Sequence, residues 1–219
     1  MTYTVAIFDL DGTLVDTLQD LADTANQMLI EYGYPQHPTD KYRYFVGDGL
    51  STLIERILPK GATSSTIVRC SERFLEIYGN CWRRKSCPYP GINAMLARLK
   101  NAGLRLAVLS NKPHRFTLEH TAHFFPPDTF DLVLGQRPEV EKKPNPQGLI
   151  EILSALDTPA STCIYIGDTA VDMQTGRAAG VFTIGVLWGF RDHQELAEHH
   201  ADLIVKHPME IVHHAVASA

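Results

Sequence analysis

The sequence has little that would mark a secreted, membrane or nucleic-acid-binding protein. Its 219 residues include four cysteines without CxxC spacing, which argues against a disulfide scaffold and favours reduced thiols. No apolar run approaches the roughly 18 residues of a membrane span, and no basic and apolar leader precedes the first core segment. The formal charge of −5 provides no broad basic surface. We therefore expect a cytoplasmic monomer or homodimer that binds a small molecule, with no nucleic-acid or membrane partner.

Metal-binding histidine motifs are also lacking. Several histidines gather near the C-terminus, but neither an HExxH pattern nor paired cysteines accompany them, so we expect surface side chains. These residues are His193, His199, His200, His207, His213 and His214.

The first distinctive stretch is an apolar, strand-favouring run that ends in Asp9-Leu-Asp11-Gly12-Thr13. Because side chains on a strand alternate, Asp9 and Asp11 should lie on the same side and close together. Two neighbouring carboxylates suit an acid and nucleophile pair, a divalent metal site, or both. A strand followed by an ordinary Asp-Gly turn is the alternative.

A long segment without strand patterns follows. Apolar residues recur at helical spacing from residue 17 to about 83, interrupted by the turn Gly47-Asp48-Gly49. We expect an inserted helical domain at residues 16–84, with the main domain formed by residues 1–15 and 85–219. The turn-rich residues 86–91 suit a hinge.

From residue 92 helices and strands alternate, which predicts an α/β fold with a mostly parallel sheet covered on both faces. The expected strands are residues 104–109, 130–134, 162–166, 182–186 and 202–205. The expected helices are residues 94–99, a segment after Pro113, and residues 146–156, 170–179 and 208–216.

Three further polar features follow predicted strands, where open α/β sheets bind their ligands. Ser110 and Asn111 precede a predicted helix and could hold an anion, although an ordinary N-cap has the same sequence. Lys143 lies in a loop before another helix and could be only a solvated charge. Asp168 and Asp172 are spaced i,i+4 at a helix entry, where both can face one site or simply cap the helix.

Together these motifs closely resemble the haloacid dehalogenase superfamily of phosphotransferases: DxDGT, a strand ending in Ser-Asn, Lys-Pro, and Gly-Asp-x-x-x-Asp, in that order. The resemblance covers nearly the whole chain and implies a Rossmann-like core with a helical C1 cap. It places the chain near the phosphoglycolate phosphatases and beta-phosphoglucomutases. The ambiguity between Lys142 and Lys143 is resolved for Lys143, which directly precedes the proline.

The resemblance also implies roles for individual residues. Asp9 would be the nucleophile, Asp11 the general acid/base, and Lys143 a catalytic phosphate ligand. The implied cofactor is Mg²⁺, bound by Asp9, Asp168 and the carbonyl of Asp11, with Asp172 acting through water or through Lys143. The implied phosphate-binding residues are Gly12, Thr13, Ser110, Asn111 and Lys143.

Residues of the helical segment should determine substrate specificity, because the core motifs bind only the phosphate and the metal. The turn of Gly47, Asp48 and Gly49 resembles the glycine-containing specificity loop of phosphoglycolate phosphatases, although a plain turn between helices is the alternative. Asp48 would repel a substrate carboxylate unless it points outward or pairs with Arg43 or Arg56.

We therefore expect a phosphoric monoester hydrolase that acts on a small phosphorylated metabolite, with 2-phosphoglycolate the leading candidate. A phosphosugar mutase on the same scaffold is the alternative, since the motifs do not separate the two. A non-catalytic binding protein is disfavoured because every catalytic residue type is present.

Overall fold

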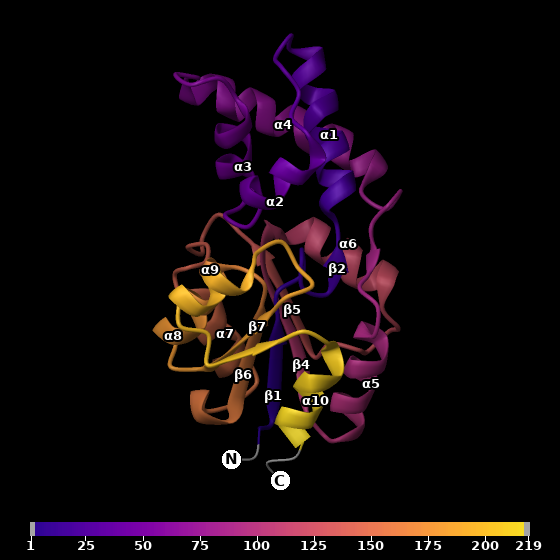
Figure 1. Cartoon of the computed structure of the whole chain (residues 1–219), viewed down its shortest axis with the longest axis vertical. Coiled ribbons are helices and arrows are strands. Elements are labelled where there is room, and N and C mark those ends of the chain that lie inside the picture. Colours follow the sequence, from indigo (N-terminus) through magenta and orange to yellow (C-terminus); the bar gives the residue numbers. More distant parts are fainter. Residues whose placement is uncertain (1–2, 217–219) are drawn as a thin grey trace.

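The computed structural model describes residues 3–216 and has a six-stranded parallel sheet at its centre (Figure 1). The strand order is β5-β4-β1-β6-β7-β8, and every neighbouring pair is parallel. The strands of this sheet are β1 (Val5–Phe8), β4 (Arg105–Pro113), β5 (Leu132–Gln136), β6 (Cys163–Gly167), β7 (Phe182–Val186) and β8 (Leu203–Val205). The expected α/β fold with a mostly parallel sheet is confirmed.

The central strand β1 shows why the sheet is covered on both faces. All four of its residues are fully buried. Ala6 and Phe8 pack in one hydrophobic cluster, with side chains of α5 (Ile92–Asn101) and α10 (Pro208–Val216). Val5 and Ile7 pack in another, with side chains of α7 (Gln147–Ala155). The alternation of side chains along the strand therefore supplies two cores, one for each face.

Helices occupy most of the remaining chain. Those around the sheet are α5 (Ile92–Asn101), α6 (His114–Phe124), α7 (Gln147–Ala155), α8 (Ala170–Ala178), α9 (His193–Glu198) and α10 (Pro208–Val216). Those between β1 and β4 are α1 (Leu18–Glu31), α2 (Tyr42–Phe45), α3 (Leu50–Ile57) and α4 (Ser64–Cys81), and the 3-10 turns are Thr39–Lys41 and Ala160–Thr162.

Two features differ from the sequence expectations. The strand expected to end at Leu109 continues to Pro113, so Ser110 and Asn111 belong to β4 and do not lie at a helix N-terminus. The short helix α9 was not expected.

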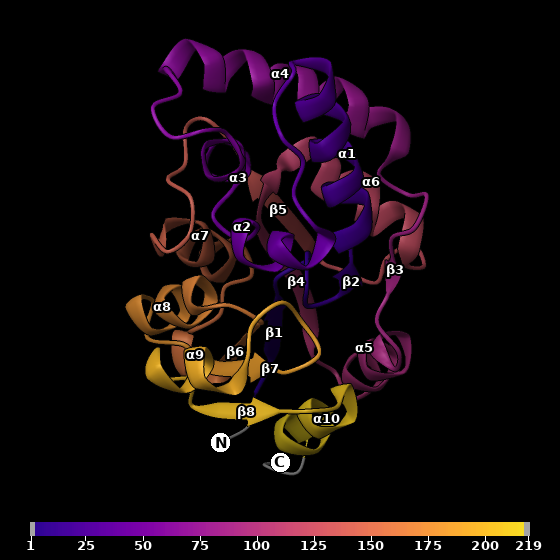
Figure 2. The same cartoon turned by 45° about the horizontal axis from the view of Figure 1, so that its top comes forward.

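Helices α1 to α4 form a separate layer above the carboxyl ends of the strands, and Figure 2 shows this layer tilted toward the viewer. Their apolar faces pack into a hydrophobic cluster of their own, to which α6 adds Phe116. A short antiparallel pair, β2 (Val15–Asp16) and β3 (Cys87–Pro88), joins this layer to the sheet. The division into a core and a cap domain of residues 16–84 remains a proposal consistent with this arrangement.

Asp20 ties the outgoing and returning connections together. Its carboxylate is buried in the first turn of α1. It accepts hydrogen bonds from the backbone N–H groups of Lys85 (3.0 Å) and Ser86 (2.8 Å) and from the Ser86 hydroxyl (2.7 Å). One side chain thereby satisfies the donors of the connection that returns to β3.

The cysteine and histidine expectations can be compared with the described residues. All four cysteines are free thiols. The six C-terminal histidines are exposed or half-buried, and none belongs to the group of side chains able to hold a metal ion. Among residues 3–216, no helix combines the length and apolar character needed to cross a membrane.

We predict that Asp20→Ala lowers the free energy of unfolding by about 3 kcal/mol, because buried donors would lose a charged acceptor. Thermal or urea unfolding measures this change. Asp23→Ala is the matched control, since Asp23 pairs with the Lys85 side chain (2.7 Å) at the surface and should contribute less than about 1 kcal/mol. Equal losses in both variants would show that Asp20 does not anchor the connection.

Candidate active site

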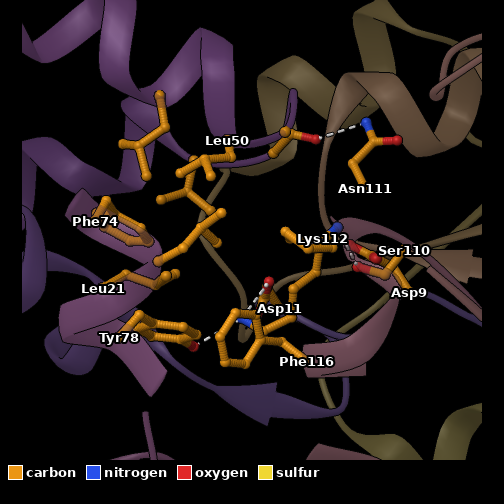
Figure 3. A pocket seen from close by; sticks show the side chains of 16 residues that line it. Asp9, Asp11, Leu21, Leu50, Phe74, Tyr78, Ser110, Asn111, Lys112 and Phe116 are labelled. Carbon is orange, nitrogen blue, oxygen red and sulfur yellow. Dashed lines mark hydrogen bonds and ion pairs between the residues drawn. The ribbon is translucent and has the colours of Figure 1, made fainter. Parts of the chain in front are cut away.

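The candidate site lies where three central strands end. Asp9 follows β1, Ser110 lies near the end of β4, and Asp168 follows β6. Because parallel strands present their carboxyl ends at one edge, residues far apart in the chain meet there. A pocket lined by Asp9, Asp11 and Ser110 opens between this edge and the helical layer (Figure 3).

Three buried carboxylates converge at the base of the site. One oxygen from each of Asp9, Asp168 and Asp172 lies within 4.8 Å of the others. Burial raises the pKa of Asp9 to about 7; Lys143 opposes the shift, while the charges of Asp172 and Asp11 add to it. Burial, followed by the charges of Asp172 and Asp9, raises the pKa of Asp168 well above its ordinary value. The cluster is short of positive charge.

Lys143 is the buried cation beside this cluster. Its Nζ lies 3.0 Å from Asp9 Oδ1 and 2.7 Å from Asp172 Oδ1. The contact with Asp9 lacks hydrogen-bond geometry, so Asp9 Oδ1 is buried without a hydrogen bond. Burial disfavours the ammonium, but the two carboxylates outweigh it and raise the pKa of Lys143 well above its usual value. Lys143 is therefore charged.

Asp172 holds Lys143 in place. Its Oδ1 also accepts a hydrogen bond from the Tyr165 hydroxyl (2.9 Å), and its Oδ2 accepts from the backbone N–H and the hydroxyl of Thr169. Both oxygens of Asp172 are thus engaged by protein donors. The expected action of Asp172, through water or through Lys143, remains a prediction, and the ion pair is the contact that the second route requires.

Asp168 sits in a tightly built cradle. Its Oδ1 accepts from the Thr13 hydroxyl (3.1 Å) and its Oδ2 from the backbone N–H of Phe190 (2.7 Å). A Cβ on Gly12, whose φ is +88°, would lie 2.3 Å from Asp168 Oδ2. Gly12 is therefore required so that the backbone can pass this carboxylate. Here the Thr13 hydroxyl positions a carboxylate.

Asp11 faces a second buried lysine. Lys112 Nζ lies 3.0 and 3.1 Å from the two oxygens of Asp11, and the Thr17 hydroxyl donates to Oδ1 at 2.7 Å. Burial opposes ionisation, but Lys112 and Thr17 outweigh it and lower the pKa of Asp11. Asp11 is consequently ionised in this arrangement.

Lys112 also reaches the helical layer. It donates to the hydroxyl of Tyr78 on α4 at 2.8 Å, and that hydroxyl lies 3.2 Å from Nε2 of the buried His120. His120 Nδ1 must carry a proton because it contacts the carbonyl of Phe116 at 2.7 Å. Burial, followed by the charge of Lys112, lowers the pKa of His120 to about 3, so the ring is neutral and Nε2 accepts from Tyr78. These roles orient the Tyr78 oxygen toward Lys112.

Asn111 connects two loops. Its amide nitrogen donates to the carbonyl of Gly47 (3.0 Å) and to the carbonyl of Lys143 (3.1 Å), and its oxygen accepts from the Lys143 N–H (2.8 Å). Its side chain therefore braces the Lys143 loop against the helical layer. The Ser110 hydroxyl accepts a weaker bond from the Lys112 N–H at 3.3 Å and faces the pocket.

The glycine turn reaches the pocket, but its aspartate does not line it. Gly47 and Gly49 are among the lining residues. Asp48 instead pairs with Arg56 at 2.6 Å, and its carbonyl accepts from Lys142 Nζ at 2.6 Å. The side chain of Asp48 is thus held by Arg56 and is not part of this pocket's lining.

Sequence reasoning missed Lys112, Tyr78 and Tyr165. Lys112 follows Ser110-Asn111 directly, which is the signal that could have singled it out. Tyr78 and Tyr165 lie in apolar helix and strand patterns, where a tyrosine is an ordinary core residue.

The carboxylate cluster fits a hard divalent cation. Asp9 Oδ1 lacks a hydrogen bond, and the three converging side chains offer oxygen only, without imidazole or thiolate. Such a donor set suits Mg²⁺. The Asp11 side chain lies outside this group of ligand atoms, and the expected contribution of its carbonyl remains a prediction.

The fold and the site define a Rossmann-like α/β enzyme with a carboxylate site at the strand ends. The chain belongs to the haloacid dehalogenase-like hydrolases, whose family profile matches residues 6–186. The resemblance carried by the four motifs is therefore confirmed.

Individual relatives point the same way. A phosphoglycolate phosphatase from Psychrobacter arcticus is 34% identical over 199 residues, covering 88% of this chain and 86% of the relative. One from Pseudomonas syringae pv. tomato is 31% identical and covers 91% of this chain and 75% of the relative. A solved structure from Lactobacillus delbrueckii subsp. bulgaricus, provisionally named a phosphoglycolate phosphatase, superposes with a TM-score of 0.93 at 30% identity, covering 98% of this chain and 99% of the other.

The raised pKa of Asp9 predicts a pH-dependent stability in excess chelator. Unfolded Asp9 is already ionised above pH 6.5, whereas the folded side chain still releases its proton near pH 7, so stability should fall as pH rises from 6.5 to 8. His120 acts in the opposite direction near pH 6.5, because its unfolded imidazole is about half protonated there while the folded ring is neutral, so the contribution of Asp9 is the difference between the wild type and Asp9→Asn. Melting temperatures with EDTA and with Mg²⁺ test this.

We expect Mg²⁺ to raise the melting temperature more at pH 8 than at pH 6.5, since a cation favours the carboxylate. The control is Asp9→Asn, in which the pH-dependent fall should be smaller. An EDTA-treated protein that gains stability across the window would contradict the assignment.

A separate prediction concerns Asp48. Because it pairs with Arg56 outside the pocket, Asp48→Ala should leave the ranking of substrates by kcat/KM unchanged. Gly49→Ala is the informative comparison, since φ is +85° there and the added Cβ would strain the turn. A changed ranking in Asp48→Ala would mean that this carboxylate reaches the substrate.

Proposed function

We propose that this protein is a Mg²⁺-dependent phosphatase that hydrolyses a small phosphate monoester through phosphorylation of Asp9. The observation that carries the proposal is the environment of Asp9. Its carboxylate faces the pocket at the strand end, beside the ammonium of Lys143, with one oxygen free of hydrogen bonds. A carboxylate that faces the pocket next to a fixed cation suits attack on a phosphoryl group.

Mg²⁺ would be held by Asp9 and Asp168, with the carbonyl of Asp11 as a further ligand. When bound, it neutralises phosphoryl charge. Lys143, held by Asp172, supplies a second positive charge, and the Ser110 hydroxyl offers a donor at the pocket wall. Gly12 and Thr13 shape the cradle of Asp168 beside the phosphate position.

The two half-reactions place opposite demands on Asp11. In the first, an Asp9 oxygen bonds to phosphorus, the bond to the leaving oxygen breaks, and a protonated Asp11 gives that oxygen its proton. In the second, an oxygen of water bonds to phosphorus, Asp11 accepts a proton from that water, and the bond between phosphorus and Asp9 breaks, which gives inorganic phosphate and the free Asp9 carboxylate. The ionised Asp11 beside Lys112 is the form required for the second step.

The names of the relatives make 2-phosphoglycolate the leading substrate candidate. The phosphosugar mutase alternative is disfavoured by the pocket. The helical layer contributes Leu21, Leu50, Leu53 and Phe74 to its wall. A sugar would place hydroxyl groups against these side chains, at about 1–3 kcal/mol for each group left without a partner. A phosphatase acting on a short substrate fits this wall better.

The test of the proposal is phosphate release from 2-phosphoglycolate and a panel of phosphosugars. With Mg²⁺, stoichiometric inorganic phosphate is expected from 2-phosphoglycolate, and excess chelator should silence the enzyme. Interconversion of a sugar 1-phosphate and 6-phosphate with little phosphate release would favour the mutase. Failure to release phosphate from every ester would overturn the enzymatic proposal.

We predict that Asp9→Ala lowers kcat at least about a thousandfold, equivalent to about 4 kcal/mol, because the attacking group is lost. Acid quenching with labelled substrate should trap phosphate on the wild type but not on the variant. The exposed Asp23→Ala serves as a matched control and should keep full activity. Asp9→Ala with more than a thousandth of wild-type activity would exclude Asp9 as the nucleophile.

A further inference from the structure

Lys112 occupies a distinctive position in the pocket. Of the described residues that line it, Lys112 alone is positively charged. The side chain is 3% exposed and comes from the core strand β4, yet it extends toward the helical layer (Figure 3). None of the catalytic steps above requires a second lysine here.

The ammonium is held in a defined orientation. One N–H is directed to the Tyr78 oxygen at 2.8 Å, and the ammonium also lies 4.7 Å from the centre of the Tyr78 ring. The two oxygens of Asp11, at 3.0 and 3.1 Å, can share a second N–H. Since an ammonium carries three donors, a third remains for another acceptor.

The surroundings increase the effect of this charge. Leu21, Phe74 and Phe116 line the same pocket and make its wall largely apolar. An ion pair or charged hydrogen bond is stronger in such an environment than in solvent. An anionic group that lies against this apolar part of the wall would meet Lys112, the one cation among the described lining residues.

The position of Lys112 indicates which part of the substrate it meets. Phosphate is expected beside Asp9 and Lys143, and the leaving oxygen must approach Asp11 to exchange a proton. Lys112 contacts Asp11 on the side where α4 closes the pocket. Atoms bonded to the leaving oxygen would therefore lie next to Lys112.

We propose that Lys112 binds a carboxylate on the leaving group and selects phosphate esters of short hydroxy acids. This inference rests on the proposed phosphatase activity and extends it to a residue that determines specificity. Lys112 also neutralises Asp11, which would otherwise repel a substrate carboxylate. Tyr78, fixed by His120, keeps the ammonium between the two negative groups.

The test compares 2-phosphoglycolate with ethyl phosphate, in which a methyl group replaces the carboxylate. For the wild type and for Lys112→Gln, the ratio of the two kcat/KM values is measured with Mg²⁺. Glutamine can still hydrogen-bond to Asp11 and Tyr78 but carries no charge. We expect Lys112→Gln to lower the ratio of kcat/KM for 2-phosphoglycolate to that for ethyl phosphate by a factor of about 10 to 100, as for the loss of one charged hydrogen bond. Most of this decrease should come from a higher KM for 2-phosphoglycolate.

Two further variants separate charge from structure. Lys112→Arg keeps the charge and should retain most of the discrimination, whereas Lys85→Gln removes a surface lysine and should change nothing. Calorimetric binding of 2-phosphoglycolate to Asp9→Asn, with and without Lys112→Gln, gives a readout independent of turnover. We expect the added substitution to weaken binding by a similar factor.

The outcomes distinguish this inference from the phosphatase proposal. If Lys112→Gln slows both substrates equally, Lys112 acts only on Asp11 and does not recognise carboxylate. If the wild type hydrolyses ethyl phosphate as well as 2-phosphoglycolate, the carboxylate inference is overturned while the phosphatase proposal stands. If neither ester nor any other releases phosphate, the phosphatase proposal itself fails.

Discussion

The structure depends on balancing negative charge that is buried at one edge of the sheet. Asp9, Asp168 and Asp172 bring oxygens within 4.8 Å of one another, where two unit charges repel by about 3 kcal/mol at an effective dielectric constant of about 20. Lys143 compensates part of this repulsion. The repulsion that Lys143 leaves uncompensated favours the binding of a divalent cation. The electrostatic cost of burying the three carboxylates and the metal binding proposed for them therefore have the same origin.

The carboxylates of the site are also packed closely against the backbone, which is possible because the neighbouring residues are glycines. A Cβ on Gly167 would lie 2.3 Å from Asp172, and one on Gly189 would lie 2.3 Å from Asp168. Gly12 is subject to the same constraint from the other side of Asp168. Asp168 and Asp172 are therefore packed closely against backbone, which leaves little room for the carboxylates to separate, so a lysine, a bound cation or a proton must offset their repulsion.

Much of this organisation could be predicted from the sequence because it is encoded locally. Strand and helix periods predicted the parallel α/β core, and the motifs singled out Asp9 at the end of β1 and Lys143 in the loop after β5, which the fold brings together. The short helix α9 could not be predicted from the sequence, because its six residues include only one buried apolar side chain and so show almost no helical periodicity. The place of Lys112 in the pocket could not be predicted for a different reason. Its partner Tyr78 lies 34 residues earlier in the chain, in the helical layer, and only the tertiary fold brings the two side chains together.

The end of β4 explains how the core and the helical layer meet at the site. Its pairing with β5 shifts register between Leu109 and Pro113, so the regular alternation of side chains is lost there. Ser110, Asn111 and Lys112 consequently all line the pocket, although they are consecutive. Asn111 donates a hydrogen bond to Gly47 in the glycine turn, and Lys112 donates one to Tyr78 on α4. Two adjacent residues of β4 thus contact two different segments of the helical layer. Any movement of that layer away from the sheet must break these two contacts, which links access to the pocket with the positions of Lys143 and Asp11.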